Sequence, residues 1–345
     1  MREIGSEFHY EQSLQTKQSV DYNFDVRDSV YVFSGRTAIE TVLNNLSGIK
    51  KALLPSYCCE SMIVPFHNAG IEVSFYSVFY ENGLQVDLKI PDDVDLLLWC
   101  NYFGFKNDMP RVDDFVKRGG VVIEDITHSY LSYQPYHNQS HYVVASLRKW
   151  FPLLCGGYCA SLNSALLKKP EKLPSKAFLD LKKQSMLQKS KYLQQVDDSL
   201  KELYLKGFEV TNHSFALDYS NTKMDAESCA ILANTDIDAV RTRRIKNASI
   251  LYEWLESQTH IRPLFDKTLM DCPLFVPIVV ENEANRTELR RFLISEKIYC
   301  PIHWPKPNGC ESNLYDMELS LICDQRYNEE DMKRIVMALN TKFNL

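Results

Sequence analysis

The chain has 345 residues, of which 39 are Lys or Arg and 45 are Asp or Glu, so its formal net charge at pH 7 is -6. This length exceeds what one hydrophobic core usually holds, and it predicts a large domain with a smaller one. The net negative charge excludes bulk electrostatic attraction as a basis for binding nucleic acids or anionic membranes. The first residues are polar, and no apolar run reaches about 18 residues, the length of a membrane-spanning helix. We therefore expect a cytoplasmic protein that handles small molecules.

The ten cysteines are expected to be reduced, because no secretion signal precedes them and most lie in apolar surroundings such as the run ending at Cys100. Cys58 and Cys59 are adjacent, and Cys155 and Cys159 are four residues apart. Neither pair has the spacing of a zinc site, and no histidine cluster completes a ligand set. We predict core cysteines and no metal site.

The first half of the chain alternates short apolar runs with helical patterns. Such alternation predicts an α/β fold in which helices flank a mostly parallel central sheet. The expected strands are 30–33, 51–54, 72–76, 95–100, 121–124 and 142–146, and the expected helices are 37–45 and 59–69.

The second half begins with a segment rich in Lys, Gln and Leu after Pro170, and its period predicts one or two helices with exposed faces. The remaining patterns indicate a smaller α+β C-terminal domain, and we place the two domains at 1–225 and 226–345. The expected elements there are a long helix over 225–256, strands at 274–280 and 298–304, and helices at 285–296 and 328–339.

Two apolar strands end in side chains that suit one site. Asp125 follows the run that starts at Val121, and Lys149 lies just beyond the next strand. Ligands of α/β sheets bind outside the carboxyl ends of the strands, so both side chains are expected at one cleft. Pyridoxal phosphate needs this pair, since a lysine holds the cofactor as a Schiff base and a carboxylate stabilises the protonated pyridine nitrogen. An aspartate that caps a helix and a solvated lysine would give the same pattern.

A third element supports the cofactor. Ser34, Gly35, Arg36 and Thr37 form a small polar turn between a strand and a helix. Backbone N–H groups and the helix dipole at such a turn hold phosphate groups. An ordinary N-terminal cap by Ser34 is the alternative interpretation.

The order of these segments resembles the DegT/StrS family of pyridoxal-phosphate sugar aminotransferases. The resemblance covers roughly residues 30–340 and implies a fold type I transferase. It is carried by SGRTA (34–38), LLPSYCCES (53–61), NYFGF (101–105), VIEDITH (122–128), SLRKW (146–150) and CGG (155–157).

The resemblance assigns roles to individual residues. Lys149 would hold the cofactor, Asp125 would pair with the pyridine nitrogen, and His128 would lie at the side of the ring oxygen. Ser146 and the turn residues Gly35, Arg36 and Thr37 would contact the phosphate. Asn221 would reach the phosphate of the partner subunit, which implies a homodimer with a shared active site. Cys59 occupies the position of the aromatic residue that stacks on the ring in the family.

The expected function is therefore transfer of an amino group from a donor such as glutamate to a keto acceptor. Lys149 favours transamination, because family members that dehydrate sugars have histidine at this position. A nucleotide-linked keto-sugar is the acceptor that the resemblance implies. The departures at Cys59, at Cys155 and over 301–305 leave a keto acid or another small carbonyl compound open. Two alternatives also remain, namely other pyridoxal-phosphate chemistry such as racemisation or elimination, and a binding protein without catalysis.

Overall fold

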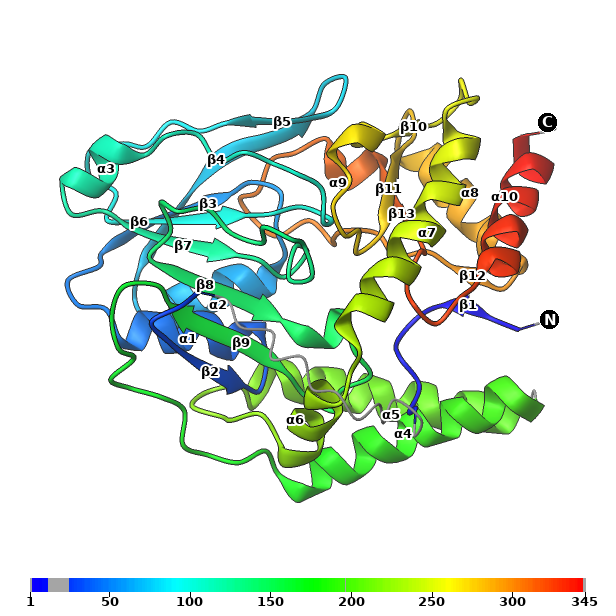
Figure 1. Ribbon diagram of the computed structural model, residues 1–345, viewed down its shortest axis with the longest axis horizontal. Coiled ribbons are helices and arrows are strands. Elements are labelled where there is room, and N and C mark those ends of the chain that lie inside the picture. Colours follow the sequence, from blue (N-terminus) through cyan, green and yellow to red (C-terminus); the bar gives the residue numbers. More distant parts are fainter. Residues whose placement is uncertain (1, 12–24, 196, 344–345) are drawn as a thin grey trace.

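The computed structural model describes residues 2–11, 25–195 and 197–343. Its largest feature is an eight-stranded sheet with the order β2-β9-β8-β7-β6-β3-β4-β5 (Figure 1). The five strands from β8 to β4 in this order are parallel, and β2, β9 and β5 pair antiparallel. The strands are β2 (Asp28–Val32), β3 (Lys51–Pro55), β4 (Glu72–Tyr80), β5 (Leu84–Asp87), β6 (Leu96–Cys100), β7 (Val121–Asp125), β8 (Tyr142–Ser146) and β9 (Gly157–Ser161). The expected mostly parallel α/β sheet is confirmed, whereas β5 and β9 were not predicted.

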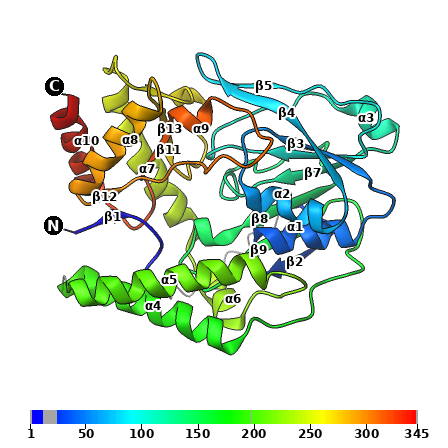
Figure 2. The same ribbon diagram turned by 180° about the vertical axis from the view of Figure 1, so that it is seen from behind.

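The central strands read as continuous apolar runs because both faces of the sheet are covered. All five residues of β6 are buried. Helices α1 (Gly35–Asn44) and α2 (Glu60–Asn68) pack against each other, and α1 also contacts β8 and β9 (Figures 1 and 2). The short helix α3 (Asp113–Lys117) lies before β7. Helix α1 begins two residues earlier than expected because the Ser34 side chain caps it by accepting from the Thr37 backbone N–H.

The segment after Pro170 forms two long helices, α4 (Lys176–Gln195) and α5 (Asp198–Leu217), which lie side by side in both ribbon views (Figures 1 and 2). One or two helices with exposed faces were expected, but the faces of these two helices are less exposed than those of a solvated segment. Lys182 and Lys189 on α4 are only 2% and 1% exposed. Both bind the N-terminal segment, since Lys182 contacts the Glu7 carboxylate and Lys189 donates to the Ser6 hydroxyl.

The long helix expected over 225–256 is wrong, because two helices occupy this range. Helix α6 (Ala226–Ala233) ends before Asn234, and α7 (Ile237–Leu255) begins after Asp236. The Asp236 side chain accepts from the Ala239 backbone N–H and so starts a new helix.

The C-terminal part also differs from the expected strand, helix and strand. Its sheet is antiparallel with the order β10-β11-β13, and the strand expected over 298–304 is only two residues long. That strand, β12, pairs in parallel with β1 near the N-terminus, and Pro301 follows it without a free N–H. The elements are β1 (Ile4–Gly5), β10 (Arg262–Pro263), β11 (Val276–Val279), α8 (Glu283–Ser295), β12 (Ile298–Tyr299), α9 (Leu314–Met317), β13 (Glu318–Leu321) and α10 (Glu329–Phe343). The division into domains at residue 225 stays a prediction.

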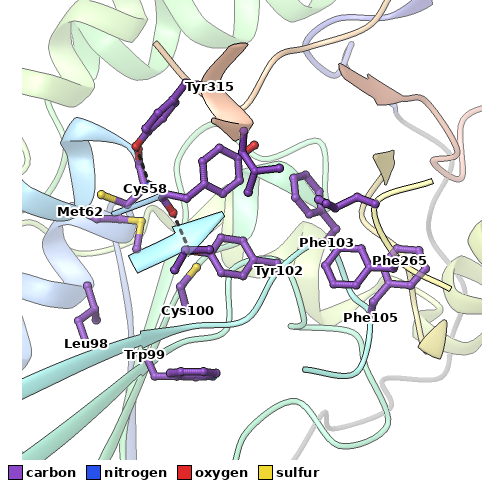
Figure 3. Close-up of a cluster of buried hydrophobic side chains, with 14 of the residues drawn as sticks. Cys58, Met62, Leu98, Trp99, Cys100, Tyr102, Phe103, Phe105, Phe265 and Tyr315 are labelled. Atoms are coloured by element: carbon purple, nitrogen blue, oxygen red, sulfur yellow. Dashed lines mark hydrogen bonds between the residues drawn. The ribbon is translucent and has the colours of Figure 1, made fainter. Parts of the chain in front are cut away.

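An aromatic cluster joins the C-terminal sheet to the large one (Figure 3). The Phe105 and Phe265 rings stack with centroids 4.8 Å apart. The Tyr315 hydroxyl donates to the carbonyl of Cys58, and the Tyr102 hydroxyl donates to the carbonyl of Tyr57. These contacts fix the C-terminal residues over the carboxyl ends of the parallel strands.

Glu124, at the end of β7, is fully buried and serves as a hydrogen-bond hub. Its carboxylate accepts from the Asn101 side chain at 2.7 Å, from the Ser140 hydroxyl at 2.5 Å and from the His137 backbone N–H at 2.8 Å. The His137 Nδ1 lies 2.8 Å from the same carboxylate. Burial opposes protonation of His137, but the hydrogen bond and charge of Glu124 outweigh it and raise the pKa of this histidine.

This pair predicts a pH dependence of folding. Because the pKa of His137 is higher in the folded chain, its stabilising effect is complete below the unfolded value of about 6.5 and is lost as pH rises through the folded value. We expect the free energy of unfolding of the wild type, relative to His137→Gln, to fall by about 1 kcal/mol over this window. Urea titrations of both proteins at several pH values measure the difference. A difference that stays constant with pH would contradict the ion pair.

Candidate active site

The ends of β6, β7 and β8 bring the predicted catalytic side chains to one edge of the sheet. Cys100 pairs with Asp125, and Asp125 pairs with Val144, two residues before the end of β8. A short 3-10 helix η1 (Leu147–Lys149) then turns the lysine back toward that edge. Thr127 ties the two strand ends together, because its hydroxyl accepts from the Ser146 N–H at 3.0 Å and its carbonyl accepts from the Trp150 indole at 2.6 Å.

Lys149 lies against His128, and the hydrogen bonds define the protonation of both. The His128 Nδ1 accepts from the Phe103 backbone N–H at 3.2 Å, so the proton of the neutral ring is on Nε2. Nε2 is 3.0 Å from the Lys149 Nζ, which therefore accepts as a neutral amine. Burial lowers the pKa of Lys149 and holds the pKa of His128 well below its ordinary value. A neutral lysine amine is the nucleophilic form.

Asp125 lies at the same edge and is 6% exposed. One carboxylate oxygen accepts from the Thr127 N–H at 2.8 Å. Burial raises the pKa of Asp125, whereas the hydrogen bonds of Thr127 act in the opposite direction. No arginine or lysine of the described ranges lies within ion-pair distance of this carboxylate, so it is suited to pair with a cationic ligand atom.

The start of α1 approaches this edge closely, and glycine allows the approach. A Cβ atom on Gly35 would lie 3.2 Å from the Ser146 Cβ. A Cβ atom on Gly157 would lie 2.3 Å from the Ser34 carbonyl oxygen, so any side chain there would move the turn. The CGG segment therefore positions the helix start beside the end of β8.

Two arginines meet next to this helix start. Arg36 donates to the Phe215 carbonyl at 3.3 Å, and the Arg148 guanidinium carbon lies 3.5 Å from the Phe215 ring centroid. The Nε atom of each arginine is buried without a hydrogen-bond partner among the described residues. Unsatisfied cationic donors beside a helix N-terminus fit a phosphate group.

Three of the predicted site residues make polar contacts to other residues of the same chain. The Thr37 hydroxyl donates to the Tyr219 carbonyl at 2.9 Å, and the Asn221 side chain accepts from the Glu171 N–H at 3.0 Å. The Cys59 thiol lies at the start of α2, 2.8 Å from the Ser61 hydroxyl. An aromatic ring beside the lysine comes instead from Trp304, whose centroid is 5.5 Å from the Lys149 Nζ.

A cavity of about 360 Å³ opens beside Lys149. Its walls come from the N-terminal segment, η1, α4, α7 and the C-terminal lobe. Four cationic side chains line it beside Lys149, and within the described residues two of the four lie at ion-pair distance from an acid: Lys182 is 2.5 Å from Glu7, and Arg326 is 2.8 Å from Asp324. The four cationic residues are Arg148, Lys182, Arg244 and Arg326.

Arg244 has no acid within ion-pair distance among the described residues. It is fully buried, its guanidinium lies 4.5 Å above the Trp150 ring, and its Nε donates to the Gln325 side chain at 2.8 Å. Its Nη1 donates to the carbonyls of Pro273 and Leu274. Because buried charge is costly without an opposite charge, the surplus positive charge favours an anionic ligand in the cavity.

Sequence reasoning assigned roles to Ser146 and Lys149 but missed the rest of the wall of this cavity. Ser6, Glu7 and Lys182 come from segments that only tertiary packing brings together. Arg244 was missed as well. A usable signal was its place on the buried stripe of α7, four residues from both Val240 and Ala248.

No family model matches the sequence, and no curated protein sequence matches it. Solved structures do match. The chain is similar to Helicobacter pylori PseC, an aminotransferase of pseudoaminic acid biosynthesis, with a TM-score of 0.68 at 13% identity over 100% of both chains. It is similar to the putative sugar aminotransferase Spr1654 from Streptococcus pneumoniae in its PLP form, with a TM-score of 0.65 at 14% identity over 98% of this chain and 92% of the other.

A third similar structure is DesV from S. venezuelae in complex with a ketimine intermediate, with a TM-score of 0.64 at 15% identity over 91% of this chain and 84% of the other. The architecture of a central sheet flanked by helices is shared with these pyridoxal-phosphate enzymes. The chain therefore has the fold type I architecture.

Proposed function

We propose that the protein is a pyridoxal-phosphate-dependent aminotransferase of the DegT/StrS type. The observation that carries the proposal is the position of the Lys149 Nζ, 3.0 Å from the His128 Nε2 at the strand edge where Asp125 also ends. The similar structures described as aminotransferases support the same chemistry.

The residues fit the cofactor. Lys149 would hold it covalently, Asp125 would face the pyridine nitrogen, and His128 would lie near the ring oxygen. The phosphate would lie at Gly35, Ser146 and the two arginines with unsatisfied Nε atoms, Arg36 and Arg148. Pyridoxal phosphate supplies an electron sink for the bonds of the substrate α-carbon.

The residues of the chain then move the protons. Once free, the Lys149 Nζ takes the proton of the substrate α-carbon as a general base, because it is held unprotonated by burial and by His128. Trp304 and Phe103 exclude water from this amine, since both rings pack on His128. The negative charge of Asp125 favours a protonated nitrogen at the opposite end of the site.

For the substrates we propose glutamate as the amino donor and a nucleotide-linked keto-sugar as the acceptor. The cationic lining of the cavity supports anionic substrates of both kinds. DesI, another similar structure, is described in the presence of its TDP-sugar product.

We further propose a cytoplasmic homodimer in which Asn221 contributes to the active site of the partner. Exposed apolar side chains on α5 support an interface, namely Leu203, Leu205, Val210 and Leu217. We propose no nucleic acid or membrane partner. No helix in the described ranges is both long and apolar enough to cross a bilayer.

The test is the visible spectrum of the purified protein with added cofactor, followed by borohydride. We expect a yellow protein in which reduction fixes one cofactor to the peptide that contains Lys149, as measured by mass spectrometry. Glutamate should then bleach the yellow form. A colourless protein with no fixed cofactor would overturn the proposal, and a yellow protein that no amino donor converts would favour elimination or racemisation.

A further inference from the structure

Three residues of the C-terminal lobe form a buried relay beside the cavity. Glu318 is fully buried, His303 is 5% exposed, and Ser320 lies between them on β13. The Ser320 hydroxyl is 2.5 Å from one Glu318 oxygen and 3.0 Å from the His303 Nδ1. The other Glu318 oxygen accepts from the His303 backbone N–H at 2.8 Å. Thus the carboxylate fixes both the backbone and the ring of His303.

The relay defines the tautomer of His303. An ionised carboxylate only accepts hydrogen bonds, so the single hydroxyl proton of Ser320 points to Glu318. The Ser320 oxygen must then accept from the His303 Nδ1, which carries the proton. The His303 Nε2 is left unprotonated, and His303 lines the same cavity as Lys149.

The two histidines of the site therefore differ in what they offer. Both ring nitrogens of His128 are engaged, one with the Phe103 N–H and the other with Lys149. The His303 Nε2 has no hydrogen-bond partner among the described residues, and the two rings are 5.4 Å apart. Of these two histidines, only His303 thus has a ring nitrogen that is free to accept a proton from a ligand.

We propose that His303 is a catalytic base that takes a proton from the ammonium group of the incoming amino donor. This inference rests on the proposed aminotransferase function. An N–H bond of the ammonium breaks and an Nε2–H bond forms, so the donor becomes a nucleophilic amine and the positive charge moves to the imidazole. Ser320 and Glu318 are positioning residues that hold the ring and stabilise this charge.

The surroundings of His303 agree with this role. Its ring packs on Phe103, Phe275 and Trp304, which carry no charge. Burial lowers the pKa of His303, and the hydrogen bond and charge of Glu318 act in the opposite direction. His128 is a further titratable group beside this ring, with the two centroids 5.4 Å apart. Burial, followed by the charge of Glu318, raises the pKa of Tyr57, which keeps its hydroxyl neutral.

The experiment compares two small amines on the cofactor-loaded protein. Ethylamine arrives as an ammonium ion at neutral pH, whereas methoxyamine is already unprotonated, so only ethylamine needs a base. The readout is the fraction of cofactor that borohydride still fixes to Lys149 after timed exposure to each amine. We expect His303→Gln to slow the exchange with ethylamine by about 100-fold, within the range of general acid–base catalysis, and to leave methoxyamine within about threefold.

The pH profile and further variants complete the test. The wild-type rate with ethylamine should rise with pH as His303 loses its proton, and this limb should disappear in His303→Gln. Ser320→Ala, which keeps the packing, should slow ethylamine about tenfold and spare methoxyamine. His141→Gln, a histidine that accepts from the Val122 N–H on the far end of β7, is the matched control and should change neither rate.

Three other results would contradict these proposals. Equal slowing of both amines by His303→Gln would show that the ring only packs the site. Unchanged exchange with ethylamine in both the His303 and Ser320 variants would exclude a base at this position. A wild-type protein that never fixes cofactor to Lys149 would overturn the aminotransferase proposal itself, which separates the two failures.

Discussion

Replacing Lys149 by alanine should abolish covalent attachment of the cofactor and lower the rate of amino transfer by at least about 10⁴-fold. This is the upper end of what one acid–base group contributes, and Lys149 supplies both the attachment and the base. The visible spectrum after addition of cofactor, and the mass of the borohydride-reduced protein, measure the first effect. Single-turnover conversion with glutamate measures the second.

The control for this change is Lys117→Ala, which removes an exposed lysine of α3. It should leave spectrum, mass and rate unchanged. If the Lys149 variant still retains cofactor after borohydride reduction and denaturation, another lysine holds it and the assignment of the site is wrong.

Replacing Asp125 by asparagine should lower the rate of amino transfer by about 10²- to 10³-fold while the cofactor remains fixed to Lys149. Asparagine keeps the shape of the side chain and its hydrogen bond to the Thr127 N–H, but it removes the negative charge. A charge that stabilises the transition state in a buried site contributes roughly this factor. Single-turnover kinetics and borohydride fixation separate the two effects.

Asp113→Asn is the matched change for this prediction, since Asp113 is an exposed carboxylate on α3. It should alter neither the rate nor the fixation. A wild-type rate in the Asp125 variant would mean that the carboxylate does not face the ring nitrogen of the cofactor.

The large sheet was predictable because its strands are short apolar runs separated by helical patterns. β6 and β7 are buried on both faces, so they read as continuous apolar runs that are too short for a buried helix. β9 escaped prediction because its glycine and small residues carry little hydrophobic signal, and its place is set by pairing with both β2 and β8. In the C-terminal lobe β10 and β13 were missed, whereas β11 and β12 fall within the strands expected at 274–280 and 298–304.

The edge that holds Asp125, His128 and Lys149 was also predictable, since sheet topology alone brings neighbouring parallel strand ends together. The opposite wall was not. Glu318 and Ser320 alternate along β13, but nothing in their spacing shows that they face His303, which lies fifteen residues before Glu318. Their arrangement depends on how the lobe packs through Phe265 and Tyr315.

The stretch 225–256 shows the limit of helical periodicity. Its apolar pattern continues across the break, and only the local competition of Asp236 for the backbone N–H of Ala239 ends one helix and starts the next. A capping residue within a periodic segment is thus a better boundary signal than the period itself.

The cavity wall is assembled from residues near both ends of the chain, from Ser6 to Arg326. A ligand that contacts such a wall acts as a cross-link between segments that the chain joins only through long loops. Its binding free energy is available only when the N-terminal segment, α4 and the C-terminal lobe are all in place. A bound ligand therefore stabilises the assembled wall by mass action. As a result, local opening of the N-terminal segment becomes rarer as the ligand concentration rises.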